Sequence, residues 1–364
     1  NCHLSSPVVA DINGDGKLEI VVATNNGHLL AVRRDGSVLW QTDVGPAFGL
    51  SSGKQQIASS PAVADIDKDG KMEVVVGTGT IYASVCTKGG VIVLDHNGRV
   101  EPGWPFITKD YAVGPAGCPD TVFATPALGD LDKDGDLEIV FASFDKSVYA
   151  LHHNGNLVAG FPPNSNLYAR FGWEVLRGRM ADTIWSSPAL ADINGDGFLN
   201  IVIGTDEGNF DTSWEPVVGN WSCPYRHPIT QGYCGGSIYA FDRAGRQLEG
   251  FPRYKYETIQ STPAIMDIDD DGRSEIFVGT GSWYFTISPD HPTLGFRLYG
   301  MDGKGNDLPG WQGGKVVGGY VTASPSIGDI TGDGEPNIVV AASDKRLYAW
   351  HINGQPVAGF PMTP

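Results

Sequence analysis

One motif occurs six times along this chain of 364 residues, and this repetition limits the fold more than any other feature. The copy that starts at Ser59 has the sequence SSPAVADIDKDGKMEVVVGT. The first aspartates of the copies are spaced by 54, 65, 62, 75 and 62 residues. Self-similarity at such intervals is the signature of a repeat architecture, in which each unit packs on its neighbours.

Each copy predicts four short strands. The first is the small apolar segment SPAVADI, and the second is a run rich in β-branched residues such as EVVVGT. A third strand such as VIVLDH ends at an Asn-Gly or Asp-Gly pair, which is a strong hairpin signal, and NLVAGFP is the expected fourth strand. No segment has a sustained period of 3.6 residues, so we expect little helix.

Four antiparallel strands repeated at this spacing predict an all-β, six-bladed β-propeller of four-stranded antiparallel blades. A linear solenoid is the alternative, but it would need capping ends, and none are apparent. Residues 1–364 are expected to form one domain, with repeats at approximately 5–58, 59–122, 123–184, 185–259, 260–321 and 322–364. A seven-bladed ring is the alternative if this chain, which begins with Asn1 rather than Met, is a fragment or a processed product.

The loop between the first two strands of each copy has the pattern D-x-[DNT]-x-D-G-x-x-[EN]. Positions 1, 3, 5 and 9 offer side-chain oxygens, position 7 offers a backbone carbonyl, and the glycine at position 6 allows a sharp turn. Hard oxygen donors at this spacing suit Ca²⁺, whereas Zn²⁺ would call for Cys or His. An EF-hand is excluded because its closing Glu stands at position 12 and helices flank its loop.

The predicted calcium ligands form six sets. They are Asp11, Asn13, Asp15, Lys17 and Glu19; Asp65, Asp67, Asp69, Lys71 and Glu73; Asp130, Asp132, Asp134, Asp136 and Glu138; Asp192, Asn194, Asp196, Phe198 and Asn200; Asp267, Asp269, Asp271, Arg273 and Glu275; and Asp329, Thr331, Asp333, Glu335 and Asn337. Positions 1, 3, 5 and 9 carry 3, 4, 4, 2, 4 and 2 carboxylates, so the fourth and sixth sites are expected to bind most weakly.

The net charge of −17 is explained in large part by these loops, because six Ca²⁺ ions would reduce it to −5. A chain this acidic repels phosphate backbones, which argues against a nucleic-acid partner. The apolar runs are too short for a transmembrane helix, so membrane insertion is not expected.

The loop following an S-P-A-x-x-D strand resembles the FG-GAP/VCBS repeat, the unit of integrin α-chain propellers and of many bacterial surface propellers. The resemblance extends over residues 5–361. It implies structural Ca²⁺ and a role in adhesion or ligand binding, although some members of the family are joined to peptidases, lyases or other enzymes. This sequence departs from the pattern at Asn200, Thr331 and Asn337, which puts full occupancy of two sites in doubt.

The long insertions are expected on the face opposite the metal loops. They are residues 79–89, 206–235 and 281–295 between second and third strands, and residues 45–58, 107–122 and 163–184 between blades. Aromatic and basic side chains there suit a glycan or protein ligand, although they could equally pack on one another. The candidate contacts are Trp173, Trp185, Trp214, Trp221, Trp283, Arg170, Arg177, Arg179 and Arg226. Four other tryptophans, Trp40, Trp104, Trp311 and Trp350, are expected to pack between blades.

Five cysteines predict two disulfides, Cys86 with Cys118 and Cys223 with Cys234, and leave Cys2 over. Disulfides together with calcium sites indicate an extracellular, secreted or cell-surface location, with the periplasm as an alternative.

No catalytic motif is present, the eight His residues are scattered, and no catalytic residue is predicted. The sequence therefore predicts a calcium-stabilised binding or adhesion module, and other domains of a longer chain are among its expected partners. The alternatives are a polysaccharide lyase, for which the Arg cluster at 170–179 is the one hint, and a purely architectural domain.

Overall fold

The computed structural model describes residues 5–80, 86–110, 117–145, 147–161, 184–205, 236–255, 257–281 and 296–363. Within them, 22 strands form six antiparallel sheets, and the only helix is a 3-10 turn, η1 (Gly45–Phe48). The β-rich prediction is therefore confirmed for the described residues, and none of their helices is long and apolar enough to cross a membrane.

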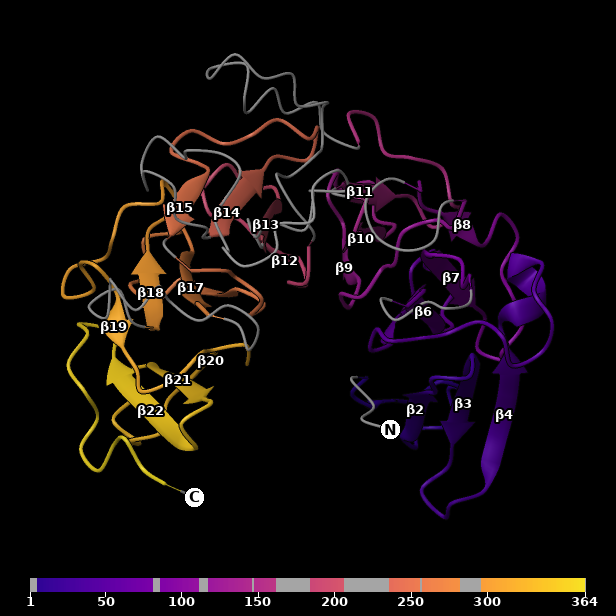
Figure 1. Cartoon of the computed structure of the whole chain (residues 1–364), viewed down its shortest axis with the longest axis horizontal. Coiled ribbons are helices and arrows are strands. Elements are labelled where there is room, and N and C mark those ends of the chain that lie inside the picture. Colours follow the sequence, from indigo (N-terminus) through magenta and orange to yellow (C-terminus); the bar gives the residue numbers. More distant parts are fainter. Residues whose placement is uncertain are drawn as a thin grey trace, which may run out of the picture. The chain divides into compact units, whose positions relative to one another are not determined.

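The six sheets follow the six repeats in order, and we number them accordingly (Figure 1). Sheets 1 to 3 contain β1 (Val8–Ala10), β2 (Glu19–Ala23), β3 (His28–Val32) and β4 (Val38–Asp43); β5 (Ala62–Ala64), β6 (Glu73–Thr78), β7 (Gly90–Leu94) and β8 (Phe106–Ile107); and β9 (Ala127–Gly129), β10 (Glu138–Ala142) and β11 (Val148–Leu151). Sheets 4 to 6 contain β12 (Ala189–Ala191), β13 (Asn200–Gly204), β14 (Gly236–Phe241) and β15 (Arg253–Lys255); β16 (Ala264–Met266), β17 (Glu275–Gly279), β18 (Arg297–Met301) and β19 (Lys315–Val316); and β20 (Ser326–Gly328), β21 (Asn337–Ala342) and β22 (Arg346–His351).

The fourth strand does not lie where the sequence predicted it. The NLVAGFP segment makes one isolated bridge, Leu151 with Leu157, and then turns at Gly160, whose φ is 98°. In sheets 2, 4 and 5 the fourth strand comes only after the corresponding turn, at β8, β15 and β19. Gly in the left-handed region ends the extended backbone, and the Pro that follows in most copies has no N–H to donate to a ladder. Sheets 3 and 6 have three strands among the described residues.

The chain divides into two compact units, Asn1–Met180 with sheets 1 to 3 and Ala181–Pro364 with sheets 4 to 6. Within each unit the first strands of successive sheets contact one another, β1 with β5 and β5 with β9, then β12 with β16 and β16 with β20. The sheets of each unit are thus arranged side by side with their first strands adjacent.

The middle sheet of each unit is buried on both faces, because successive residues of a strand point to opposite sides. In β6, Val74 and Val76 pack in the cluster with Val21 and Leu29 of sheet 1, whereas Val75 packs with residues of sheet 3. Sheet 5 repeats this arrangement between sheets 4 and 6. Every residue of β6 is therefore buried, which explains why its sequence is a continuous apolar run rather than an alternating one.

Tryptophans connect neighbouring sheets, as the sequence predicted. The indole N–H of Trp104 in sheet 2 donates to the carbonyl of His153 in the hairpin turn of sheet 3, at 3.0 Å. Trp40 makes the same bond to His96 at 3.0 Å, and Trp311 makes it to Ile352 at 2.7 Å. Each of these hydrogen bonds joins the last part of one repeat to the turn after the third strand of the next repeat.

Serines of the S-[ST]-P segments form a second connection between sheets. The backbone N–H of Ser6 donates to the Ser60 hydroxyl at 2.8 Å, and Ser186 donates to the carbonyl of Ser261 at 2.9 Å. Both pairs are one repeat apart in sequence, so the serines of this motif are explained by packing between repeats.

Candidate metal-binding loops

All six D-x-[DNT]-x-D-G loops lie between the first and second strands of their sheets, and the same hydrogen bond closes each of them. The backbone N–H at position 2 donates to a side-chain oxygen at position 9, which is the first residue of the second strand. These bonds are Ile12 to Glu19 at 3.1 Å, Ile66 to Glu73 at 3.0 Å, Leu131 to Glu138 at 2.7 Å, Ile193 to Asn200 at 3.0 Å, Ile268 to Glu275 at 3.0 Å and Ile330 to Asn337 at 3.0 Å. The position-9 side chain is buried in every loop, so this contact is a fixed part of each sheet.

Side-chain oxygens at positions 1, 3 and 5 accept backbone amides of their own loop. In loop 1, Asp11 accepts the amides of Asp15 at 3.1 Å and Gly16 at 2.8 Å, Asn13 accepts that of Asp15 at 2.9 Å, and Asp15 accepts that of Lys17 at 2.9 Å. The position-5 contact recurs in all six loops. One oxygen of this carboxylate is held by the backbone, and in loops 1 and 2 its second oxygen lies beside the position-7 lysine, Lys17 with Asp15 at 3.7 Å and Lys71 with Asp69 at 3.0 Å.

Carboxylate oxygens gather most closely in loops 2, 3 and 5. The ligand atoms of Asp65, Asp67 and Glu73 lie within 4.8 Å of one another, and so do those of two aspartate triplets, Asp130, Asp132 and Asp134 in loop 3 and Asp267, Asp269 and Asp271 in loop 5. These are the loops with four carboxylates at the ligand positions. Oxygens around a Ca²⁺ ion bonded at 2.3–2.6 Å are separated by about 3.4 to 5 Å, so this spacing fits calcium.

Two buried oxygens in these loops have no hydrogen-bond partner. They are Oδ1 of Asp65 and Oδ1 of Asp130, the position-1 aspartates of loops 2 and 3. A buried carboxylate oxygen without a donor is costly unless a cation offsets its charge. The donor set and these two atoms therefore fit a hard divalent ion, which would be held by the side chains at positions 1, 3, 5 and 9.

Burial and neighbouring carboxylates affect the protonation of the closing residue. Burial raises the pKa of Glu73 to about 7, with further repulsion from Asp67, Asp69 and Asp65 and a partial offset from the Ile66 amide. The pKa of Glu275 is raised to about 7 for the same reasons. Burial also raises the pKa of Glu138. Without a cation, burial and the neighbouring carboxylates therefore disfavour the ionised form of the closing glutamate in these loops.

Loops 4 and 6 have amides where the other loops have acids. Asn200 and Asn337 keep the closing hydrogen bond but contribute no charge. Thr331 replaces the position-3 acid, and its hydroxyl donates to Asp329 at 3.4 Å rather than accepting the position-5 amide. The loop conformation thus survives the loss of charge, and only the electrostatic attraction for a cation is reduced.

Loop 3 contains two histidine contacts that sequence reasoning missed. Nδ1 of His152 lies 3.1 Å from Oε1 of Glu138, and Nδ1 of His153 lies 2.9 Å from Oδ2 of Asp136. Both histidines follow β11, which pairs with β10 next to the loop. The register of β10 with β11 could have revealed the contact of His152 with Glu138, because the residue just after the third strand lies opposite position 9.

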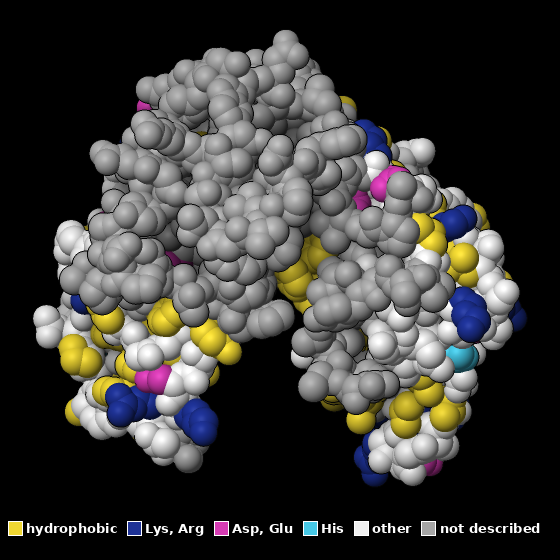
Figure 2. Space-filling view, in the orientation of Figure 1, with side chains coloured by type: hydrophobic (Ala, Val, Ile, Leu, Met, Phe, Trp, Pro, Cys, Tyr) yellow, Lys and Arg dark blue, Asp and Glu magenta, His cyan; other side chains and the backbone are white. Residues whose placement is uncertain are grey.

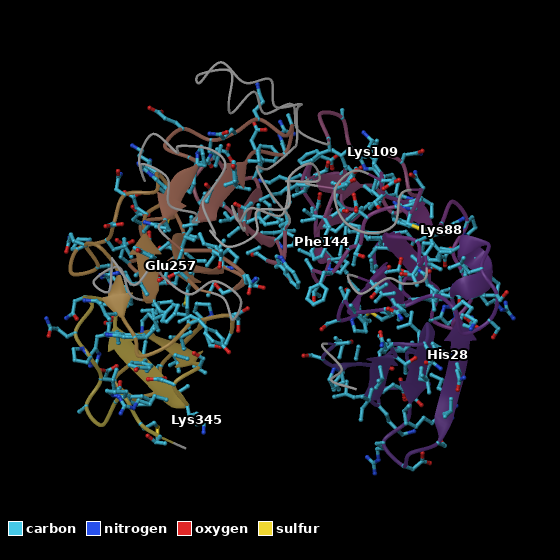
Figure 3. The ribbon with its side chains drawn as sticks, in the orientation of Figure 1. His28, Lys88, Lys109, Phe144, Glu257 and Lys345 are labelled. Carbon is cyan, nitrogen blue, oxygen red and sulfur yellow. A yellow bond between two sulfur atoms is a disulfide. The ribbon has the colours of Figure 1, made fainter. Side chains whose placement is uncertain are left out.

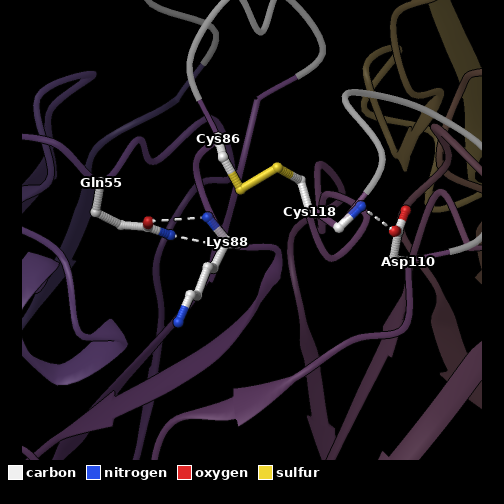
Figure 4. Close-up of a disulfide and its surroundings, with 6 residues drawn as sticks. Gln55, Cys86, Lys88, Asp110 and Cys118 are labelled. Carbon is white, nitrogen blue, oxygen red and sulfur yellow. Dashed lines mark hydrogen bonds between the residues drawn. A yellow bond between two sulfur atoms is a disulfide. The ribbon is translucent and has the colours of Figure 1, made fainter.

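In the long insertions of the first unit, the disulfide between Cys86 and Cys118 confirms one of the two predicted pairings (Figure 4). It joins the insertion of sheet 2 to the segment that leads to sheet 3. Close by, the Gln55 side chain accepts from the Lys88 backbone N–H at 3.2 Å and donates to the Lys88 carbonyl at 2.5 Å. The disulfide and these hydrogen bonds therefore connect three segments that are far apart in sequence.

A buried carboxylate extends this network to sheet 3. Asp145 accepts from the Tyr149 hydroxyl at 2.5 Å and from the Lys109 backbone N–H at 3.2 Å, and burial raises its pKa. Phe144, beside it, donates its backbone N–H to the carbonyl of Thr121 at 2.9 Å. Lys88, Lys109 and Phe144 are labelled in Figure 3.

In the second unit, Glu257 is a buried acid that the sequence did not single out (Figure 3). Its Oε2 accepts from the Thr280 hydroxyl at 3.2 Å, and its Oε1 is buried without a partner. Burial raises the pKa of Glu257 to about 7. This residue precedes the first strand of sheet 5, away from the metal loop.

Among the predicted ligand contacts, Trp185 is described and is half-buried. The remaining eight, Trp173, Trp214, Trp221, Trp283, Arg170, Arg177, Arg179 and Arg226, lie outside the described residues, as do Cys2, Cys223 and Cys234. On the face shown in Figure 2, the described side chains are a mixture of hydrophobic and basic types with few acidic ones.

A family model for the FG-GAP-like repeat matches residues 8–76 and 130–203, which contain loops 1, 2, 3 and 4. No curated protein is similar enough to this chain to count as a match.

Several solved structures are similar in fold. BBS1N in complex with ARL6DN has a TM-score of 0.53 at 10% identity, over 96% of this chain and 80% of that one. The biofilm matrix protein Bap1 of V. cholerae has a TM-score of 0.45 at 19% identity, over 83% of this chain, which spans only 38% of the length of Bap1. The PilY1 C-terminal domain of Pseudomonas aeruginosa has a TM-score of 0.47 at 15% identity, over 97% of this chain and 77% of that domain. Only the first of these similarities bears on the fold.

Proposed function

Because this chain carries FG-GAP-like repeats, matched at residues 8–76 and 130–203, we propose that it is a calcium-stabilised binding module of the cell surface or extracellular space. Its ligand is a protein or a glycan that contacts the face formed by the long loops. Calcium has a structural role, and no catalytic step is assigned to it.

The sixfold recurrence of one loop geometry carries this proposal. In every repeat the position-9 oxygen closes the loop onto the position-2 amide, and in loops 2, 3 and 5 carboxylate oxygens from three ligand positions lie within 4.8 Å of one another. A single loop of this kind could be an Asp-Gly turn without a metal. Six turns without a metal would not each need two to four mutually repelling carboxylates at the same positions. The calcium ligands are therefore those predicted from the sequence, with loops 2, 3 and 5 binding most tightly.

Calcium would supply folding free energy through these loops. Each ion offsets carboxylate repulsion and connects the first strand of a sheet to the second, so binding favours the folded chain over the unfolded one. At a calcium concentration of a hundred times Kd, one site contributes about 2.7 kcal/mol to the free energy of unfolding.

We further propose that the six sheets are blades of one closed ring. Sheet 1 has an apolar face that sheet 2 does not cover, where Ile20 pairs with Val32 and Val22 pairs with Leu30; Ile20 is 38% exposed. In sheet 6, Val339, Ala341 and Leu347 lie on the face away from sheet 5. Each of these faces would be covered by a neighbouring blade in a propeller, which would leave no apolar surface in water.

The long insertions of the first unit support a binding role and an oxidising location. The bond between Cys86 and Cys118, the Gln55 contacts with Lys88, and the Asp145 network hold several insertions in one arrangement. Loops held rigid by a scaffold are a common place for ligand contacts, and disulfides persist outside the cytosol.

A glycan array combined with a panel of surface proteins tests this function. We expect a defined set of ligands to bind in calcium and to be lost in chelator, and Trp185→Ala to weaken binding at a temperature at which the variant is still folded. Trp350→Phe, a change inside the core of sheet 6, is the matched control and should leave binding unchanged. The proposal would be contradicted if no glycan or surface protein bound. It would also be contradicted if binding persisted in chelator after the protein had unfolded.

A further inference from the structure

We propose that loop 3 is a binding site for a first-row transition ion, best represented by Zn²⁺, with Asp132, Glu138 and His152 as its protein ligands. The proposal rests on the arrangement of one loop and its neighbouring strand. Asp132 and Glu138 are also ligands of the proposed calcium site. For these two residues, the inference rests on the proposed function.

The three candidate ligands come from two segments. Asp132 stands in the loop, Glu138 begins β10, and His152 follows β11, the strand that pairs with β10. Their ligand atoms all lie within 4.8 Å of one another, and Nδ1 of His152 is 3.1 Å from Oε1 of Glu138. The second oxygen of Glu138, Oε2, remains on the Leu131 amide at 2.7 Å. One carboxylate can thus close the loop and offer its other oxygen to a metal.

A nitrogen donor changes which ion the loop prefers. Ca²⁺ takes oxygen ligands almost exclusively, whereas Zn²⁺ binds imidazole nitrogen and carboxylate oxygen together at 2.0–2.2 Å. Three protein ligands with a remaining position for water are a common zinc arrangement. The Glu138 side chain is fully buried and the His152 side chain is about one-third exposed, so the ligands are positioned by the sheet while the ion can enter from solvent.

The charge around loop 3 is also unusual for this chain. Position 7 carries Asp136, whereas loops 1, 2 and 5 have Lys17, Lys71 and Arg273 there. In loops 1 and 2 that lysine forms an ion pair with the position-5 aspartate, Lys17 with Asp15 at 3.7 Å and Lys71 with Asp69 at 3.0 Å. Loop 3 has no such lysine at position 7 and has two adjacent histidines instead.

Other repeats of the same chain provide comparisons. Loop 2 has the same four carboxylates as loop 3, but Asp95 stands where loop 3 has His152. Loop 6 has a histidine at the equivalent place, His351, but it faces the amide of Asn337 at 3.3 Å, and position 3 is Thr331. Among the described residues, loop 3 alone combines the histidine with the carboxylates.

Zinc titration of the chelator-stripped protein in calcium-free buffer tests this inference, because calcium would compete for Asp132 and Glu138. His152→Gln is the informative variant, because the glutamine amide can still donate to Glu138 but cannot bind the metal through an imidazole. We expect one zinc site in the wild type and a loss of its affinity by roughly 100-fold in His152→Gln. His351→Gln is the matched control and should bind zinc as the wild type does. Equal zinc affinity in wild type and His152→Gln, or a wild type without zinc binding, would overturn the proposal.

Copper as a spectroscopic probe gives a second readout that a purely structural role would not alter. With one equivalent of Cu²⁺, the electron paramagnetic resonance spectrum of the wild type should contain nitrogen hyperfine splitting that is absent from His152→Gln and present in His153→Gln. The same splitting in all three proteins would contradict a ligand role for His152. Calcium content and melting temperature are measured in parallel, so a loss of zinc binding with calcium retained refutes only this inference, and zinc binding without calcium refutes only the proposed function.

Discussion

The backbone N–H of Ile193 donates to the side-chain oxygen of Asn200 at 3.0 Å, in the same place where Ile66 donates to Glu73. An amide oxygen therefore performs the structural role of a carboxylate in closing the loop. Asn at position 9 preserves the turn while removing one negative charge. The closing hydrogen bond therefore does not require a charge at position 9.

Removing the position-5 aspartate should have unequal effects in different loops. Asp69→Ala in loop 2 removes one of four carboxylates from a tight site, whereas Asp333→Ala in loop 6 removes one of two from a weak site. We expect calcium titration calorimetry to record the loss of a high-affinity site in Asp69→Ala and of a low-affinity site in Asp333→Ala. Equal affinities for the two lost sites would show that carboxylate count does not rank the loops.

The stability of the metal-free protein should fall as the pH rises from about 5 to about 8. The folded-state pKa of Glu73 and of Glu275 is about 7, above the value of 4.5 expected for an unfolded chain. Between these values the folded state binds more protons, so raising the pH removes stability until the carboxyls are ionised. Thermal melts in chelator across this range provide the measurement.

Saturating calcium should weaken this pH dependence, because the ion stabilises the ionised carboxylates. Glu73→Gln is the control, since its side chain can still accept the Ile66 amide but no longer titrates. A metal-free protein that becomes more stable between pH 5 and pH 8 would contradict the assignment of these two groups.

Trp104→Phe should lower the free energy of unfolding by about 1 to 3 kcal/mol. The indole N–H would no longer donate to the partly buried carbonyl of His153 in the sheet 3 hairpin. Phenylalanine is expected to fit, because Phe251 occupies the equivalent place in sheet 4. Trp40→Phe breaks the same type of bond at a less buried position and should cost less. Urea unfolding measures both, and a larger loss for Trp40→Phe would show that burial does not set the cost.

Replacing Cys86 and Cys118 together by Ser should destabilise the chain by roughly 3 to 4 kcal/mol, the loop entropy expected for cysteines 32 residues apart. Free-thiol counting after denaturation checks the bond itself. In the wild type, Cys86 and Cys118 should not react with a thiol reagent. The double variant should therefore have the same number of reactive thiols as the wild type. Full reactivity of Cys86 and Cys118 in the untreated wild type would exclude the disulfide.

The repeat sequence was sufficient to predict the sheets and the loops between their first and second strands. The periodic aspartates mark the loops, and the apolar runs mark the buried second strands. The packing of Trp104 and Trp311 between sheets was also predictable, because large aromatic residues recur at one place in the repeat.

Other features could not be predicted because they depend on partners far apart in sequence. The fourth strands were displaced because the turn at Gly103 or Gly250 comes before pairing resumes, and the apolar pattern alone does not distinguish a turn from a strand. The contact of His152 with Glu138 requires the strand register, and the buried position of Glu257 requires the packing of the segment before sheet 5.

Calcium content measured directly is the most decisive test of this account. The chain should be stripped with chelator, dialysed against calcium in large excess, and assayed for bound calcium per chain by atomic emission, alongside a melting curve in each condition. The account predicts at least three tightly held ions per chain, rising toward six as calcium increases, with a lower melting temperature after stripping. No calcium retained above the dialysis buffer, together with unchanged melting curves, would contradict it.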